Sequence, residues 1–497
     1  MSTLLRPALL ASACAILLAG CVLGPNFERP KNDVAVVSFA RAAPAGGSIH
    51  TIEALPPARW WAIFDDPELD ALEARVVTAN LDIQTASARV RQSRARIGIA
   101  QAAGLPTVDS AASYQRQRSN PAGLSGVPSA ATSPSFDAFQ FGVDAAWELD
   151  LWGQARRTVE VAHALETAAY EDRRFAVLAV QAEVARDYIA LRGNLALLAI
   201  LGDNFKTARD SAKLAHSRFD NGVTTRLDVA NAEAEVATIE AKIPSVEAAR
   251  DEQINALGLL LAMEPHALEG ELSASRTQPL PARDIPVGLP SNLLRRRPDV
   301  RRAEAALHAA TARIGIAKAD FYPRISLTGS FGSEALQLSD FGSWSSRQLS
   351  VGPTITLPIF QGGRLRGALE LRTAEQQEAA IEYHRTVLNA WREVDDALTA
   401  YAAEARRRSS LNRAVEQNTQ ALAIAQRRYQ EGAIDFLNVL SVQKALLESR
   451  GDLVLSSVAD SQEVVTLYKA LGGEWELDFP EDEDHQFSAI PPQAAHP

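Results

Sequence analysis

The chain has 497 residues, with 50 Lys and Arg against 61 Asp and Glu and a formal net charge of −11. This acidic balance, without a concentrated basic face, argues against a nucleic-acid partner, because proteins that follow phosphates carry clustered Lys and Arg. Aromatic residues make up only 6%. Ala, Glu, Gln and Arg crowd the periodic stretches, which is typical of long helices packed through small residues and not of two or three compact domains.

The N-terminal residues 1–20 are predicted to be a lipoprotein signal peptide. Arg6 supplies the positive charge, and the apolar stretch that follows is too short to span a bilayer. It ends in Leu-Ala-Gly before Cys21, the residue predicted to carry the lipid. The residue after Cys21 is Val22 and not Asp, and in this the chain resembles lipoproteins that are sorted to the outer membrane. An ordinary secretory signal is the alternative. Cys14 would leave with the signal, so no thiol would remain for a disulfide or a metal.

The next segment, 22–65, is rich in Pro, Gly and Ala and is predicted to be extended, anchored by its aromatic residues Trp60, Trp61 and Phe64. A helix is predicted at 66–104. The sequence Asp66-Pro67-Glu68 places an N-cap, a Pro at the first helical position and an acid in the first turn.

Four segments alternate apolar and polar residues with period 2, as strands do. They lie at 106–116, 138–151, 323–333 and 347–360. One apolar and one polar face suit a membrane barrel strand, although a half-buried soluble hairpin has the same pattern. Trp147, Trp152 and Phe360 at the strand ends favour the membrane, as an interfacial girdle would. So do the polar connecting loops.

Long helices follow each pair of strands. They are predicted at 153–221 and 225–263, and again at 363–431 and 435–471, with a shorter helix at 298–321. A helix of roughly 70 residues is about 100 Å long and must pack against neighbours in a coiled-coil manner. Residues 264–290 form a Pro-rich linker, and the acidic tail 473–497 is predicted to be disordered.

The chain contains a long internal duplication. The stretch Ala95–Ala100 returns as Ala312–Ala317, and Arg218-Phe219-x-x-Gly222-Val223 returns as Arg428-Tyr429-x-x-Gly432-Ala433. The duplicated units are predicted at 66–263 and 291–472. Such a duplication indicates a fold built by pairing like units.

Four strands cannot close a barrel, and an open edge within hydrocarbon costs several kcal/mol for each unpaired backbone group. The sheet is therefore predicted to close by oligomerisation. Two chains would give eight strands with a filled interior, whereas three would give twelve strands and a water-filled lumen. The long helices leave the same ends of the strands and would form a tunnel on the periplasmic side.

A set of short motifs now identifies a family. The motifs are Cys21-x-x-Gly24-Pro25-x-Phe27, Trp60-Trp61-x-x-Phe64-x-Asp66-Pro67-x-Leu69, Asn80-x-Asp82, Leu294-x-Arg296-Arg297-Pro298-Asp299-Val300, Ala319-x-Phe321-x-Pro323-x-Ile325, Arg428-Tyr429-x-x-Gly432 and Tyr468-Lys469-Ala470-Leu471-Gly472-Gly473. In this order the chain resembles the TolC/OprM-type outer-membrane efflux proteins, and among them the NodT-type outer-membrane lipoproteins of tripartite (RND-type) efflux systems.

The resemblance implies a mainly α fold with membrane β structure, in two tandem repeats of a β-hairpin plus long coiled-coil helices. A homotrimer would form a 12-stranded β-barrel and a 12-helix periplasmic α-barrel, with the linker 264–290 in the equatorial region. It would be a lipid-anchored outer-membrane protein with a long periplasmic extension. It would conduct drugs or toxic compounds passively from the periplasm, joined to an inner-membrane RND-type pump by a periplasmic adaptor.

The resemblance also places the closed periplasmic tip at two helix turns. The tip residues are Phe219, Asp228, Tyr429, Asp435, Leu437 and Ser441, and the adaptor-contacting turn residues are Gly222, Val223, Gly432 and Ala433. Leu437 matches the apolar ring that occludes the tip. Related proteins often carry Asp where this chain has Ser441, so a charged selectivity ring is not carried over to that position. Asp228 and Asp435 suit either negative charge at the tip or helix capping, and capping is favoured.

No catalytic constellation is found in the sequence. The eight His are scattered, and no Gly-rich phosphate loop follows a strand. An enzyme is therefore not expected, nor a cofactor or a metal. The alternatives are a periplasmic coiled-coil scaffold or adaptor lipoprotein, and an outer-membrane conduit of a type I protein secretion system. The alternating segments argue against the first alternative, and the lipid anchor and NodT-type motifs argue against the second.

Overall fold

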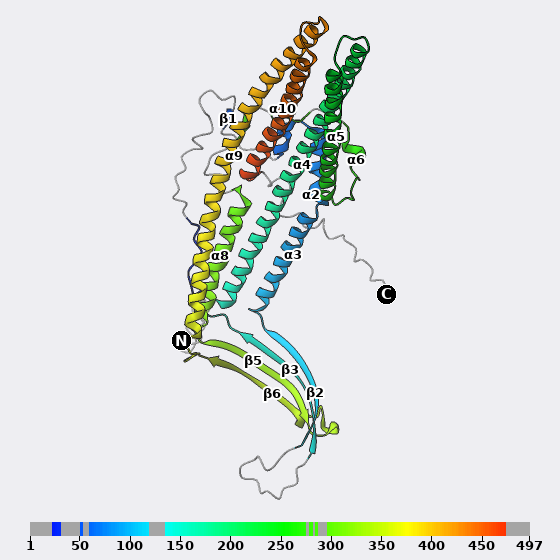
Figure 1. The fold of residues 1–497 in the computed structure, drawn as a ribbon. Coiled ribbons are helices and arrows are strands. Elements are labelled where there is room, and N and C mark those ends of the chain that lie inside the picture. Colours follow the sequence, from blue (N-terminus) through cyan, green and yellow to red (C-terminus); the bar gives the residue numbers. More distant parts are fainter. Residues whose placement is uncertain are drawn as a thin grey trace. The chain divides into compact units, whose positions relative to one another are not determined.

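The computed structural model describes residues 22–30, 50–52, 59–118, 135–274, 278–281, 284–286 and 296–473 (Figure 1). The predicted signal peptide, Cys21 and the tail from residue 474 lie outside the described residues. The chain divides into two compact units. The first comprises Met1–Pro30, Val90–Ala169 and Ala303–Tyr383, and the second Lys31–Arg89, Tyr170–Arg302 and His384–Pro497. Each unit takes segments from both copies of the duplication, so the compact units are not the predicted repeats.

The first unit contains a four-stranded antiparallel sheet. Its strands are β2 (Thr107–Arg118), β3 (Ser135–Glu148), β5 (Arg324–Ala335) and β6 (Arg347–Thr356), in the order β2-β3-β5-β6. The prediction carried the last strand to residue 360, whereas β6 ends at Thr356. The ladder ends there because Thr356 pairs with Arg324, the first residue of β5. The pairing of β3 with β5 joins the two copies.

The strand register separates apolar from polar side chains. Ser110, Val143, Phe331 and Leu349 lie side by side across the four strands, and so do Asp109, Asp144, Ser330 and Ser350. Successive side chains on a strand point to opposite faces, so the first row belongs to one face and the second row to the other. Leu349, Val351 and Ile355 are exposed on the apolar face. The sheet thus has one apolar and one polar face, as a barrel strand between lipid and water needs.

Residues 22–30 lie along α8 (Pro298–Ala319) and the first turns of α4 (Gln154–Asp220), within the first unit. The buried Arg157 donates from Nε to the Leu23 carbonyl at 3.1 Å and from Nη2 to Asn26 Oδ1 at 2.9 Å. Further along, the Phe27 ring stacks on His308 with centroids 4.5 Å apart. These contacts hold the segment against side chains from both copies.

A close backbone approach belongs to the same contact. Gly24 has φ +95°, and a Cβ on it would lie 2.5 Å from the Gly315 Cα atom. Gly315 is the glycine of the second Ala-Arg-Ile-Gly-Ile-Ala stretch. At its counterpart Gly98, an added Cβ atom would have no neighbour within 4 Å. The duplicated motif is therefore used differently in the two copies.

The predicted single helix at 66–104 is wrong, because the chain forms α2 (Pro67–Ala79) and α3 (Leu81–Ala102). Asn80 has ψ 131°, which interrupts the helix. Its side-chain oxygen accepts from the N–H groups of Asp82 and Ile83 at 2.9 and 3.1 Å. Asn80 thus ends one helix and caps the next, and this gives the Asn80-x-Asp82 motif a structural reason.

The remaining helices are α5 (Arg226–Leu260), α6 (Glu269–Leu272), α9 (Arg364–Gln430) and α10 (Phe436–Ala470). No helix in the described ranges is long and apolar enough to cross a membrane. Two predicted irregular segments contain regular structure. Trp60–Phe64 is a 3-10 helix, and His50–Ile52 pairs in parallel with Asp284–Pro286 of the linker.

Candidate functional site: the two helix turns

The turns that follow α4 and α9 have the same backbone geometry. At the end of α4, Gly222 donates to the Phe219 carbonyl at 2.9 Å and Val223 donates to the Arg218 carbonyl at 2.8 Å. At the end of α9, Gly432 and Ala433 make the corresponding bonds to Tyr429 and Arg428 at 3.0 and 2.9 Å. Gly222 and Gly432 have φ +72° and +75°, which glycine adopts without strain. The second unit therefore contains two matching helix hairpins, one from each copy.

One hydrophobic cluster joins the two hairpins. Its buried members are Ala212, Ala215, Val229 and Ala232 from the first copy, with Ala425, Tyr429, Phe436 and Val439 from the second. The Tyr429 and Phe436 ring centroids are 5.5 Å apart. The first copy supplies mainly small side chains, and the second supplies the aromatic rings that pack against them. The hairpins are thus held together by complementary sizes.

Arg218 adds a polar contact between the hairpins. Its guanidinium carbon lies 4.3 Å from the Tyr429 ring centroid, and Nη1 donates to the Tyr429 carbonyl at 3.4 Å. A guanidinium over an aromatic ring is attractive, by about 0.5–1 kcal/mol at exposed sites and more where it is desolvated. The sequence prediction named Phe219 and Tyr429 at the tip but gave Arg218 no role. The duplicated Arg-aromatic pair in the sequence singles out Arg218 as a residue with a role at the turn. The sequence does not show which aromatic ring its guanidinium contacts.

The helix starts after the two turns differ. Thr225 caps α5 through a capping box, in which its hydroxyl accepts from the Asp228 N–H and the Asp228 carboxylate accepts from the Thr225 N–H. The hydrogen bond from the Thr224 hydroxyl, together with those from Thr225, lowers the pKa of Asp228. Asp435 occupies the N-cap position of α10, but its side chain makes no cap hydrogen bond. The favoured capping role therefore holds for Asp228 and is wrong for the Asp435 side chain.

The other predicted tip residues divide between buried and exposed. Tyr429 is 7% exposed and lies inside the cluster, whereas Phe219 is 37% exposed. Leu437 is 61% exposed, and Ser441 is exposed one turn further along α10. The structure thus places Leu437 on the surface of the chain, where another molecule can cover it. Val223 and the two turn glycines are exposed as well.

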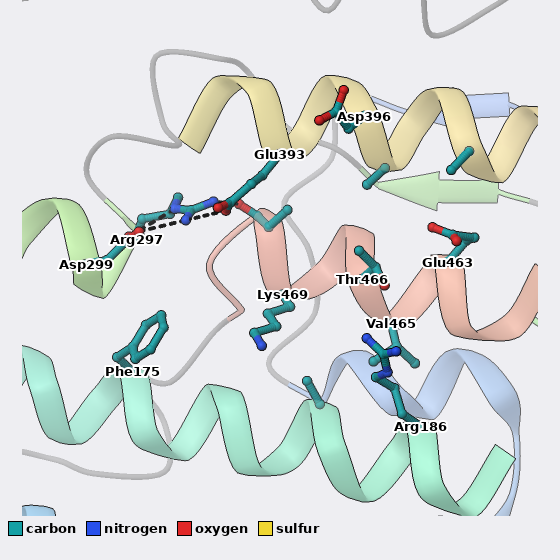
Figure 2. Close-up of a pocket in the computed structure, with 14 residues that line it drawn as sticks. Phe175, Arg186, Arg297, Asp299, Glu393, Asp396, Glu463, Val465, Thr466 and Lys469 are labelled. Carbon is teal, nitrogen blue, oxygen red and sulfur yellow. Dashed lines mark hydrogen bonds and ion pairs between the residues drawn. The ribbon is translucent and has the colours of Figure 1, made fainter. Parts of the chain in front are cut away.

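Apart from the turns, a hollow lies beside the Arg-Pro-Asp motif, between α4, α9 and α10 (Figure 2). It measures about 470 Å³. Arg297 lies at its edge and bonds Asp299 Oδ2 and Glu393 Oε2, each at 2.7 Å, and the Ala470 carbonyl at 2.9 Å. A buried charge needs such partners. The motif therefore acts as a clamp that ties the start of α8 to α9 and α10.

The comparisons with known proteins agree with this architecture. The family model described as Outer membrane efflux protein matches residues 75–262 and 289–473. The chain therefore belongs to the outer membrane efflux protein family. It is an outer-membrane protein with the function of that family, an efflux channel.

Individual relatives match over nearly their whole length. The chain is 33% identical over 475 residues to the outer membrane protein OprJ of Pseudomonas aeruginosa, covering 95% of this chain and 97% of that protein. It is 30% identical over 458 residues to Nodulation protein T of Rhizobium leguminosarum, covering 92% and 94%. Among solved structures, the outer-membrane channel OprN matches with a TM-score of 0.82 and 33% identity, covering 92% of this chain and 100% of that one. The fold is therefore that of the TolC-type outer-membrane channels.

Proposed function

We propose that three copies of this chain form a passive exit duct of a tripartite efflux pump. The observation that supports the trimer is the open sheet. Strands β2 and β6 each have one partner within the described sheet, and the apolar face is exposed. Pairing β6 of one protomer with β2 of the next satisfies both edges, and three such pairings enclose a water-filled lumen.

The proposed partners follow from the family. The adaptor protein contacts the exposed turns at Gly222, Val223, Gly432 and Ala433, and an inner-membrane pump supplies the energy. No catalytic step by this chain is part of the proposal. The relatives' names range from pyoverdine export to solvent and toluene efflux, which supports small molecules as the cargo. Cys21 carries the lipid, and palmitate labelling that survives Cys21→Ser would contradict this.

The exposed Leu437 side chains of three protomers are proposed to meet at the duct axis and close the tip. The Arg218 contact with Tyr429 holds each protomer's hairpins in that closed arrangement. The two features act together, since removing the leucine widens the constriction and removing the arginine lets the hairpins separate.

The test is single-channel conductance in planar bilayers. Leu437→Ala combined with Arg218→Ala is expected to raise the conductance above that of the unaltered protein. The control is Leu455→Ala combined with Arg218→Ala, because Leu455 is on the same helix and is 52% exposed but lies away from the turn.

Equal conductance of the two double variants would contradict the role of Leu437. The same preparations test the assembly, because a heat-sensitive trimer band is expected on a gel. Extraction of the unaltered protein only as a monomer would overturn the duct itself.

A further inference from the structure

The apolar face of the sheet carries basic residues at one end only. Within β2, β3, β5 and β6, the strand register places Arg116, Arg118 and Arg347 on this face. All three lie beside the loops, since β2 ends at Arg118 and β6 begins at Arg347. The remaining base of these strands, Arg324, belongs to the polar face at the opposite end of the sheet. The apolar face therefore has a basic rim, made of Arg116, Arg118 and Arg347.

The side chains of the basic rim are exposed and positively charged in sum. Arg116 is 71% exposed, and its Nε lies 4.0 Å from Asp137 Oδ1. Asp137 is the one acid that these strands place on the apolar face. Within the described part of the chain, Arg118 and Arg347 are exposed and contact no carboxylate. Two of the three arginines are therefore available to an anion from outside the chain.

The position of the rim indicates its depth in the membrane. In the proposed trimer the apolar face contacts lipid, where an arginine is costly at the bilayer midplane but costs little near the interfaces. The interval from Arg347 to Ile355 along β6 has about the length of a strand that crosses a bilayer, roughly 9–11 residues. Leu349 and Val351 are exposed apolar residues within this interval. When the interval fills the hydrocarbon, the rim lies at the level of the lipid headgroups.

An exposed tryptophan lies beside the rim. Trp344 is 82% exposed, and the Arg347 guanidinium carbon is 4.6 Å from its ring centroid. Tryptophan is enriched at membrane interfaces. Near the opposite end of the sheet, β3 places Trp147 on the apolar face, but no strand places a base there. Only the loop end thus combines an interfacial aromatic ring with arginines, so the two ends of the sheet suit different headgroup layers.

We propose that the basic rim binds the phosphate groups of lipopolysaccharide, the phosphorylated glycolipid of the outer leaflet. This inference rests on the proposed trimer, in which β6 pairs with β2 of the next protomer and Arg347 comes to the same end and face as Arg116 and Arg118 of that protomer. Each seam then presents three arginines to one headgroup. The planar guanidinium bonds phosphate oxygens in pairs. The long helices leave the other end of the sheet towards the periplasm, so the loop end meets the outer leaflet.

The test is lipid binding to the full-length protein, purified as the trimer in a neutral detergent. The probe is diphosphorylated lipid A, the membrane-embedded part of lipopolysaccharide, and bound lipid is counted by native mass spectrometry over a range of lipid concentrations. Arg118→Gln combined with Arg347→Gln is expected to weaken binding about 25-fold, or about fivefold for each arginine removed from an anionic surface. Arg116 is kept, so that Asp137 retains its partner.

The matched control combines Arg364→Gln with Arg366→Gln. Both arginines are exposed at the start of α9, so this variant loses the same charge on the helix side of the sheet. It is expected to bind lipid A as the unaltered protein does. The inference is overturned if the double variant of the rim binds as tightly as the unaltered protein, or if the control weakens binding as much.

Two further lipids test the choice of ligand. Lipid A without its phosphates and phosphatidylglycerol are both expected to bind the unaltered protein more weakly than diphosphorylated lipid A. Equal binding of either lipid overturns the inference, and so does displacement of lipid A by inorganic phosphate at constant ionic strength. A preparation without a trimer contradicts the proposed duct, whereas a trimer that does not bind diphosphorylated lipid A overturns this inference alone.

Discussion

The two helix turns have the same backbone conformation but differ in the contacts that their side chains make. Aligning the duplicated Arg-aromatic-x-x-Gly motif places Thr225 opposite Asp435, Arg226 opposite Phe436 and Asp228 opposite Asn438. The first turn is secured locally, by a capping box. The second turn is secured at long range, by aromatic rings buried against the first copy. After duplication, the hairpin of the first copy has become the platform, a surface of small side chains. The hairpin of the second copy has become the part that packs its aromatic rings on that platform.

The largest expected difference between the turns concerns their aromatic residues. Tyr429→Ala is expected to destabilise the tip by about 3–5 kcal/mol, because it removes a buried ring from the shared cluster. Phe219→Ala at the equivalent position should cost much less, since Phe219 is 37% exposed. Amide hydrogen exchange in the last turns of α4 and α9 measures both. Equal losses of protection would contradict the division into platform and packed hairpin.

A smaller difference is expected at the caps. Thr225→Ala should cost about 1 kcal/mol, since it deprives the first turn of α5 of its cap acceptor. Asp435→Ala should cost only a few tenths of a kcal/mol, because its side chain makes no cap hydrogen bond. Exchange of the Asp228 and Asn438 amides reports the two helix starts separately. A cost at Asp435 as large as at Thr225 would show that its charge at the helix start matters more than hydrogen bonding.

The smallest expected difference is a response to acid. The pKa of Asp228 is lowered from its ordinary value of 3.8, first by the hydrogen bond from Thr224. A group with a lowered folded pKa contributes stability that is present above the ordinary value and is lost as the pH falls through the folded one. The start of α5 should therefore loosen below about pH 4. Exchange measured at pH 5 and pH 3 tests this, and Asp228→Asn should remove the response.

The local parts of this fold could be predicted from the sequence, because their causes are local. Gly222 and Gly432 end long helices, and Thr225 with Asp228 starts the next one. Alternating side chains likewise indicated the four strands, since the period of two is set by each strand alone. The break at Asn80 is local too. The Asn80-x-Asp82 pattern indicates a helix cap at this position. The helical composition on both sides of it favoured one continuous helix instead.

The choice of partners could not be predicted in the same way. The sequence shows an arginine at 218, but its ring partner is 211 residues away along the chain. Asp435 has the right residue type for a cap, yet its side chain makes no cap hydrogen bond. The contact of Gly24 with Gly315 likewise depends on two distant segments approaching. Such outcomes are decided by tertiary packing, which local propensity does not contain.

The seam between β3 and β5 has a consequence for assembly. It pairs Phe139–Glu148 with Ser326–Ala335, a ladder as long as the hairpin of β5 with β6. A half-length chain carrying one copy would have to form this ladder with a second molecule at its cellular concentration. Joining the copies makes the encounter intramolecular, so that it no longer depends on the concentration of a second molecule. Half-length chains would have to form both the β3–β5 pairing and the β6–β2 pairing between separate molecules. The duplication makes the first of these a step of folding, and only the second, between whole chains, still depends on the expression level.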